Sequence, residues 1–122
     1  MTRRVLIVED EKNIVESLTF LLGRAGFAIA AVMDGTAALQ RIRDEPPDVV
    51  ILDVNLPGTD GFDILRAVRA TPETRDLPVV MLTARMQQQD RRTAEDIGAT
   101  EFIAKPFSNA HVVDTVKRLI DP

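Results

Sequence analysis

Apolar residues in this chain of 122 residues gather in short, nearly continuous runs, and between the runs they recur every three or four positions. The clearest run lies within 48–53, with Pro46-Pro47 before it and Pro57-Gly58 after it. A run this short, rich in Val and Ile and bounded by turn residues, is typical of a buried parallel strand, because a helix would need about 10 residues or more. By the same pattern we expect strands at 5–8, 27–32, 48–53, 77–83 and 101–104.

The segments between these runs carry the spacing of amphipathic helices. We expect helices over 11–24, through 37–42, through 62–68, over 86–97 and through 112–120. Asp34-Gly35 is expected to form a turn, Thr59 or Asp60 to cap the third helix, and Ser108 to cap the last one. The helix over 86–97 is mostly polar, so we expect it to be the least firmly held of the set.

Strands and helices that alternate five times predict an α/β fold, namely one doubly wound (βα)5 domain with a five-stranded parallel sheet. We expect the flavodoxin-like strand order 2-1-3-4-5, because it places the switch point between strands one and three. The length fits a single domain over 1–122.

Composition excludes several classes of protein. Apolar runs are far shorter than the roughly 20 residues of a membrane helix, so we expect no membrane contact. The chain has no Cys, which removes disulfides, zinc-thiolate sites and thiol catalysis and is compatible with a cytoplasmic location. A net charge of −4 and a pI near 4.9 argue against direct binding of nucleic acid by this domain.

Polar residues stand at the carboxyl ends of the predicted strands, which meet at one edge of a parallel sheet. They are Glu9 and Asp10, then Asp53, Thr83 and Lys105. Three carboxylates favour a hard cation such as Mg²⁺ with several waters retained. Together with a hydroxyl and an ammonium they supply the parts for phosphoryl transfer, in which a carboxylate can act as the nucleophile. Asp53 is the candidate nucleophile.

The same residues form motifs that resemble the receiver domains of two-component response regulators. The matching segments are Val8-Glu-Asp-Glu11, Leu52-Asp53, Pro57-Gly-Thr-Asp-Gly61, Leu82-Thr-Ala84 and Lys105-Pro-Phe107. They occur in order and at family-like spacing over essentially the whole chain, which makes the set specific where no single motif would be.

The resemblance implies a phospho-accepting switch rather than a turnover enzyme. Asp53 would take a phosphoryl group from the phosphohistidine of a sensor histidine kinase or phosphotransfer protein, and an output domain or downstream protein would read the result. It also implies a role for each site residue: Mg²⁺ binding for Glu9, Asp10, Asp53 and the backbone carbonyl of Asn55, phosphoryl contacts for Thr83 and Lys105, and a cis Lys105-Pro106 bond.

In this family the switch moves Thr83 toward the phosphoryl group and turns an aromatic inward, which alters the face made by the fourth helix, fifth strand and fifth helix. That aromatic is Phe102 here, and since it lacks a hydroxyl it must act through ring packing. Glu9 replaces the Asp of many relatives, and Arg85 and Asn55 flank the path of a hydrolytic water.

A shared dimer of winged-helix relatives uses charged residues on that face. This chain lacks the usual charged residues at those positions, which are Ile97, Thr100, His111 and Thr115. We therefore expect a monomer or a weak, phosphorylation-dependent dimer, with His111 solvated and without a catalytic role.

Three other readings remain open. A metal-dependent phosphohydrolase would also use an aspartyl nucleophile, but it normally has a second Asp where this chain has Asn55. A nucleotide-binding domain would need a glycine-rich first loop. A degenerate receiver could bind partners without phosphorylation, although its acid set and Lys105 would then be unexplained.

Overall fold

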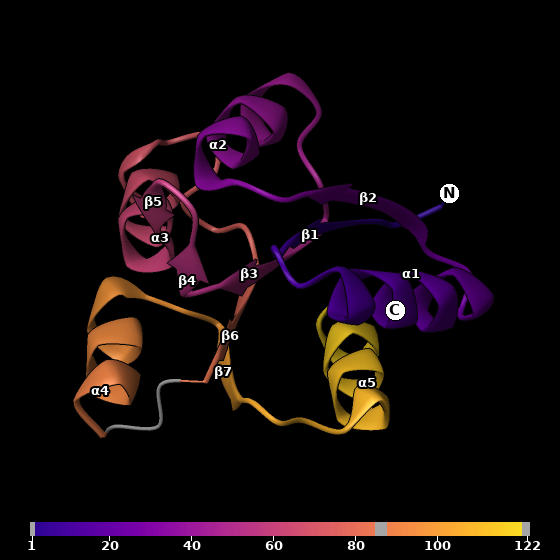
Figure 1. Cartoon of the computed structure of the whole chain (residues 1–122). Helices are drawn as coiled ribbons and strands as arrows, with labels where there is room; N and C mark the ends of the chain where they lie inside the picture. The colour runs from indigo at the N-terminus through magenta and orange to yellow at the C-terminus, as the bar shows by residue number, and fades with distance from the viewer. Residues whose placement is uncertain (1, 85–87, 121–122) are drawn as a thin grey trace.

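The computed structural model describes residues 2–84 and 88–120 and contains a parallel sheet of five strands (Figure 1). Its order is β2-β1-β3-β6-β7. Two short strands outside this sheet carry the numbers four and five, so β6 and β7 are the fourth and fifth strands of the sheet, and the predicted order 2-1-3-4-5 is confirmed. The strands are β1 (Arg4–Val8), β2 (Ala28–Val32), β3 (Val49–Asp53), β6 (Val79–Thr83) and β7 (Glu101–Ala104).

Helices cover both faces of the sheet, as Figure 1 shows. The helices are α1 (Lys12–Arg24), α2 (Gly35–Asp44), α3 (Gly61–Ala70), α4 (Gln88–Ile97) and α5 (Asn109–Ile120). α1 and α5 pack together on one face, whereas α2, α3 and α4 lie on the other. None of the helices within 2–84 and 88–120 is long and apolar enough to cross a membrane.

Two hydrophobic clusters fill the space between sheet and helices. Successive side chains of a strand point to opposite faces, so Ile7 and Ile51 pack under α1 and α5, whereas Val8 and Leu52 pack under the other three helices. All five residues of β3 and of β6 are buried. These two central strands therefore form a rigid base that carries Asp53 and Thr83 at their ends.

The loop after β3 contains a feature that the apolar pattern did not predict. β4 (Asn55–Leu56) and β5 (Thr59–Asp60) pair as a two-stranded antiparallel hairpin around the expected turn, with Gly58 at φ 76°. The Asp60 carboxylate then caps α3 by accepting a hydrogen bond from the Phe62 amide at 2.8 Å. Of the two predicted caps, Thr59 and Asp60, the helix therefore uses Asp60.

Asp34-Gly35 is not the turn that we expected. Gly35 is the first residue of α2, and Asp34 caps this helix by accepting a hydrogen bond from the Ala37 amide at 2.8 Å. A Cβ at position 35 would lie 2.5 Å from the Cβ of Thr59, so the glycine allows α2 to approach the hairpin closely. The Asp-Gly pair serves a helix start rather than a reversal of the chain.

Other boundaries differ from the predicted ones by a residue or two, as is usual at element ends. The predicted strands 27–32 and 77–83 begin at Ala28 and Val79. The predicted helix 86–97 is described from Gln88 onward, because 85–87 lie outside the described residues. In α4 only Ala94 is buried, and the expectation that this helix is the least firmly held stays a prediction.

Candidate functional site

Asp53 is held at the centre of the carboxyl edge of the sheet. It ends β3, between β1 and β6, and only 3% of its surface is exposed. The Asn55 amide donates a hydrogen bond to its Oδ1 at 3.3 Å. Gly61 packs so close behind it that an added Cβ would lie 2.3 Å from the Asp53 carbonyl oxygen. The close approach of Gly61 therefore restrains the backbone from which the Asp53 side chain projects.

Two further carboxylates meet Asp53 at this edge. Glu9 follows β1 and is fully buried, whereas Asp10 is exposed. Glu9, Asp10 and Asp53 each offer a carboxylate oxygen, and these oxygens all lie within 4.8 Å of one another. The three predicted acidic metal ligands are thus brought together. Metal binding by the Asn55 carbonyl stays a prediction.

Lys105 faces these acids from the end of β7. Its backbone amide donates to the Thr83 carbonyl at 2.7 Å, and the predicted cis bond to Pro106 is present. Its Nζ lies 2.8 Å from Glu9 Oε1, 3.1 Å from Glu11 Oε1 and 3.4 Å from Asp53 Oδ2. Lys105 therefore lies beside Asp53, as predicted, but the ammonium is shared among three carboxylates.

The electrostatics of the site follow from this crowding. Burial raises the pKa of the Glu9 carboxyl from 4.5 to about 7, and the contacts with Lys105 and with the Glu11 amide offset this only in part. Burial alone would lower the pKa of the Lys105 ammonium, but its contacts with Glu9, Asp53 and Glu11 outweigh burial and raise that pKa. The site thus combines an overcrowded set of acids with a firmly protonated lysine.

The donor set fits a hard divalent cation. Glu9 Oε1 is close enough to Lys105 Nζ for an ion pair, yet it accepts no well-directed hydrogen bond from the described part of the chain. A buried carboxylate oxygen without a directed donor, beside two other carboxylates, suits Mg²⁺, which takes oxygen ligands and keeps several waters. Glu9, Asp10 and Asp53 could therefore hold this ion.

The two predicted switch residues lie on neighbouring strands. Thr83 is fully buried at the end of β6, one residue beyond Leu82, which pairs with Asp53. Phe102 of β7 is half-buried, and the guanidinium carbon of Arg91 lies 5.3 Å from the centre of its ring. Arg91 itself is an exposed residue of α4, so this contact is made at the surface of the molecule. Arg85 and Gln87 lie outside the described residues.

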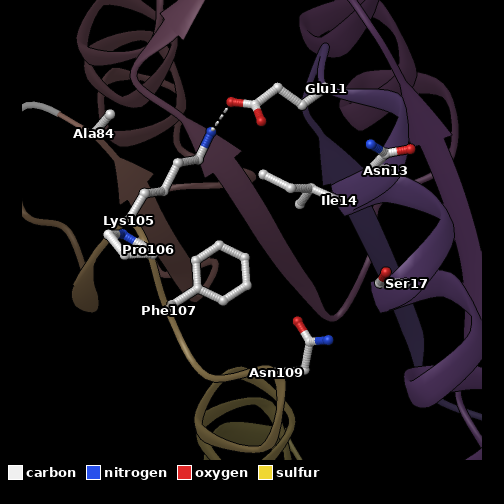
Figure 2. Close-up of a pocket in the computed structure, with 9 residues that line it drawn as sticks. All are labelled: Glu11, Asn13, Ile14, Ser17, Ala84, Lys105, Pro106, Phe107 and Asn109. Atoms are coloured by element: carbon white, nitrogen blue, oxygen red, sulfur yellow. Dashed lines mark hydrogen bonds and ion pairs between the residues drawn. The ribbon is translucent and has the colours of Figure 1, made fainter.

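A pocket of about 460 Å³ opens beside Lys105, between the start of α1 and the loop after β7 (Figure 2). Figure 2 shows the side chains of Ile14 and Phe107 facing this space and the contact between Glu11 and Lys105 at one side of it. Sequence reasoning quoted Glu11 within a motif but gave it no role. The pocket is lined by Glu11, Asn13, Ile14, Ser17, Ala84, Lys105, Pro106, Phe107 and Asn109.

On the face formed by α4, β7 and α5, His111 is exposed as expected. Thr115 is buried, and its hydroxyl donates a hydrogen bond to the His111 carbonyl at 2.8 Å. Thr115 is therefore used within α5 rather than offered to a partner. The weakened dimer stays a prediction.

Comparison with known proteins agrees with this geometry. The family model for the response regulator receiver domain matches residues 5–117. The chain belongs to this family. A Chloroflexus aurantiacus protein classed as a response regulator shares 35% sequence identity with this receiver domain over 100% of both chains, with a TM-score of 0.92.

Two other solved receivers have the same fold. The chemotaxis response regulator CheY4 of Vibrio cholerae is 30% identical over 98% of this chain and 100% of its own, with a TM-score of 0.91. The phosphorylated cyanobacterial phytochrome response regulator RcpA is 25% identical over 97% and 91%, with a TM-score of 0.84. Receiver domains are signalling modules of two-component systems that work with a histidine kinase or phosphotransfer partner, so membership supports a phosphoacceptor role.

Proposed function

We propose that this receiver domain accepts a phosphoryl group on Asp53 from a phosphohistidine donor. The observation that carries the proposal is the position of the Asp53 carboxylate, which lies 3.4 Å from the Lys105 ammonium and within 4.8 Å of two further carboxylates at the end of a buried strand. A buried acid flanked by a cation and by a potential metal site is poised to act as a nucleophile.

In the proposed reaction an Asp53 carboxylate oxygen attacks the phosphorus of the donor. A new P–O bond forms, the P–N bond to the donor histidine breaks, and its electron pair returns to the imidazole nitrogen, which takes up a proton. Mg²⁺ bound by Glu9, Asp10, Asp53 and the Asn55 carbonyl would supply positive charge beside the phosphoryl oxygens. Lys105 and Thr83 donate hydrogen bonds to those oxygens.

The donor docks, in this proposal, at the pocket between α1 and the loop after β7. Ile14 and Phe107 give it an apolar floor, and Asn13, Ser17 and Asn109 give it polar groups. A surface of this kind suits a protein partner, because apolar anchors surrounded by polar contacts are typical of such interfaces. Lys105 lines the same pocket, so a docked donor would lie next to the acceptor.

Signal output is proposed to pass through Thr83 and Phe102. Movement of the Thr83 hydroxyl toward the phosphoryl group would leave space that the Phe102 ring can enter, and this would break its contact with Arg91 on α4. The phosphorylated state would therefore change the face formed by α4, β7 and α5. The contact between Arg91 and Phe102 supports this route because it links α4 directly to the ring.

Phosphoramidate, which carries the same P–N bond as phosphohistidine, provides the test. We expect incubation with Mg²⁺ to add one phosphoryl group, measured by intact mass, and to add none when the metal is removed by a chelator. Asp53→Asn should abolish the gain, whereas Asp63→Asn, which alters an exposed carboxylate paired with Arg66, should leave it unchanged. Uptake that survives Asp53→Asn would refute the proposal.

The same incubation separates the alternatives. A phosphohydrolase would release phosphate from ordinary phosphate esters through many turnovers, whereas a receiver should take up one group per chain and leave such esters intact. A degenerate receiver would take up none. Asn55 occupies the position where such a hydrolase normally carries its general acid, which favours the receiver.

A further inference from the structure

We propose that Glu11 is a positioning residue that holds the Lys105 ammonium in the unphosphorylated state and gives it up when a phosphoryl group arrives on Asp53. This inference rests on the proposed function and adds a residue to it. The phosphoryl contact of Lys105 would then depend on competition with a carboxylate outside the metal cluster.

The distances around Nζ are the first support. The contact between Lys105 and Asp53, at 3.4 Å, is the longest of the three ion pairs. The contact with Glu11, at 3.1 Å, also has the geometry of a hydrogen bond. In this state the ammonium is therefore directed toward Glu11 rather than toward the acceptor carboxylate.

The conformation of Glu11 is the second support. Glu11 is the N-cap residue of α1, but its side chain makes no capping hydrogen bond to the helix. It reaches instead to a lysine 94 positions later in the chain. A carboxylate at a helix start ordinarily finds its partners among the first amide groups, so the direction of this side chain is set by Lys105.

Burial indicates which contact is exchanged. The Glu9 side chain is fully buried, so if Lys105 moved away the Glu9 carboxylate would lose this partner and no water could solvate it. The Glu11 side chain is 60% exposed, and water can solvate its carboxylate once the lysine has gone. Phosphorylation of Asp53 places a group with a charge of about −2 next to Lys105 Nζ. Glu11 is therefore the partner that Lys105 releases at the lowest cost.

Removal of the Glu11 charge should strengthen the binding of a phosphoryl analogue. We use beryllofluoride with saturating Mg²⁺ and the whole chain, and we expect Glu11→Gln to bind it about two- to fivefold more tightly, which is the range that a partly exposed ion pair can supply. Phosphorylation by phosphoramidate should become faster by a similar factor. Glu11→Asp, one methylene shorter, should resemble Glu11→Gln.

Glu16→Gln is the matched control, because it removes the same charge from an exposed position of the same helix. It should leave beryllofluoride affinity at the wild-type value. High salt should shrink the difference between wild type and Glu11→Gln, since the pair is open to solvent on the Glu11 side. An unchanged thermal unfolding midpoint would show that neither variant acts through misfolding.

A direct readout comes from the lysine side chains, which are Lys12, Lys105 and Lys117. With ¹⁵N-labelled lysine, Lys12→Arg and Lys117→Arg identify the Nζ signal of Lys105 by elimination. Beryllofluoride should shift this signal, and in Glu11→Gln the signal of the free protein should already lie part of the way toward the bound position.

Equal beryllofluoride affinity and equal phosphorylation rates for Glu11→Gln and Glu16→Gln would overturn this inference and leave the phosphoacceptor role of Asp53 intact. Weaker binding by Glu11→Gln would also overturn it, because Glu11 would then assist the phosphoryl contact of Lys105. A wild-type chain that takes up neither beryllofluoride nor a phosphoryl group would refute the proposed function itself.

Discussion

Arg69 of α3 donates a hydrogen bond from its Nε to the carbonyl oxygen of Gly98 at 2.9 Å, and so ties α3 to the chain that leaves α4. The same guanidinium donates to the Leu77 carbonyl before β6 at 2.7 Å and contacts the Thr100 hydroxyl before β7 at 3.5 Å. Its position at the amino edge of the sheet fixes one end of α4, while the other end of that helix lies toward the site.

Replacement of this guanidinium should destabilise the fold without touching the site. We expect Arg69→Ala to lower the free energy of unfolding by about 1–3 kcal/mol, because the part-buried Leu77 carbonyl loses its charged donor. Arg66→Ala, which breaks an exposed pair with Asp63 on the same helix, should cost no more than about 0.5 kcal/mol. Urea denaturation measures both, and equal losses would contradict the role given to Arg69.

Gly61 should be indispensable for the geometry of the acceptor. A Cβ there would lie 2.3 Å from the Asp53 carbonyl oxygen and 2.8 Å from the Val54 Cα, and backbone atoms cannot move aside as the end of a side chain can. Gly61→Ala should therefore reduce both stability and phosphoramidate-driven phosphorylation. Gly23→Ala, in α1 with open space around the added carbon, should stabilise the chain by up to about 1 kcal/mol and leave phosphorylation unchanged. A Gly61→Ala protein with wild-type phosphorylation would disprove this.

The convergence of the site could be predicted from sequence because it depends on the topology alone. Once alternating strands and helices imply a parallel sheet, the residues after β1, β3, β6 and β7 must share one edge, whatever their rotamers. Asp53 and Lys105 therefore lie together although 52 positions separate them. The side of the sheet that each strand residue faces follows in the same way from the two-residue repeat.

Features that depend on a few side-chain directions could not be predicted. The hairpin of β4 and β5 has two-residue strands, which are too short to show any periodicity. The sequence around Asp34 is compatible with a turn and with a helix cap, and only the packing of Gly35 against Thr59 selects the cap. The contacts of Glu11 with Lys105, and of Arg91 with Phe102, depend on the conformations of two exposed side chains, Glu11 and Arg91, which the apolar pattern does not constrain.

Mg²⁺ should reverse the effect that Asp10→Asn has on the thermal stability of the chain. Without metal, Asp10→Asn should be more stable than the wild type, because it relieves repulsion among the clustered carboxylates of Glu9, Asp10 and Asp53. With Mg²⁺ the wild type should gain stability by ligand binding and the variant should gain much less. Thermal unfolding with a chelator and then with a Mg²⁺ series measures both effects. A variant that responds to Mg²⁺ as strongly as the wild type would exclude Asp10 from the metal site.

The packing of Arg91 on Phe102 should make a measurable contribution to how α4 is held. The guanidinium carbon lies 5.3 Å from the ring centre, and a cation above an aromatic ring at a largely exposed site is worth about 0.5–1 kcal/mol. A double-mutant cycle of Arg91→Ala and Phe102→Leu should give a coupling energy of that size in urea denaturation, whereas the cycle with the exposed neighbour Arg92→Ala should give none. If phosphorylation draws the ring inward, the coupling should also disappear once beryllofluoride and Mg²⁺ are bound. A coupling that persists in the bound state would mean that Phe102 keeps its place when Asp53 is occupied, and the proposed route from the acceptor to α4 would have to run through other residues.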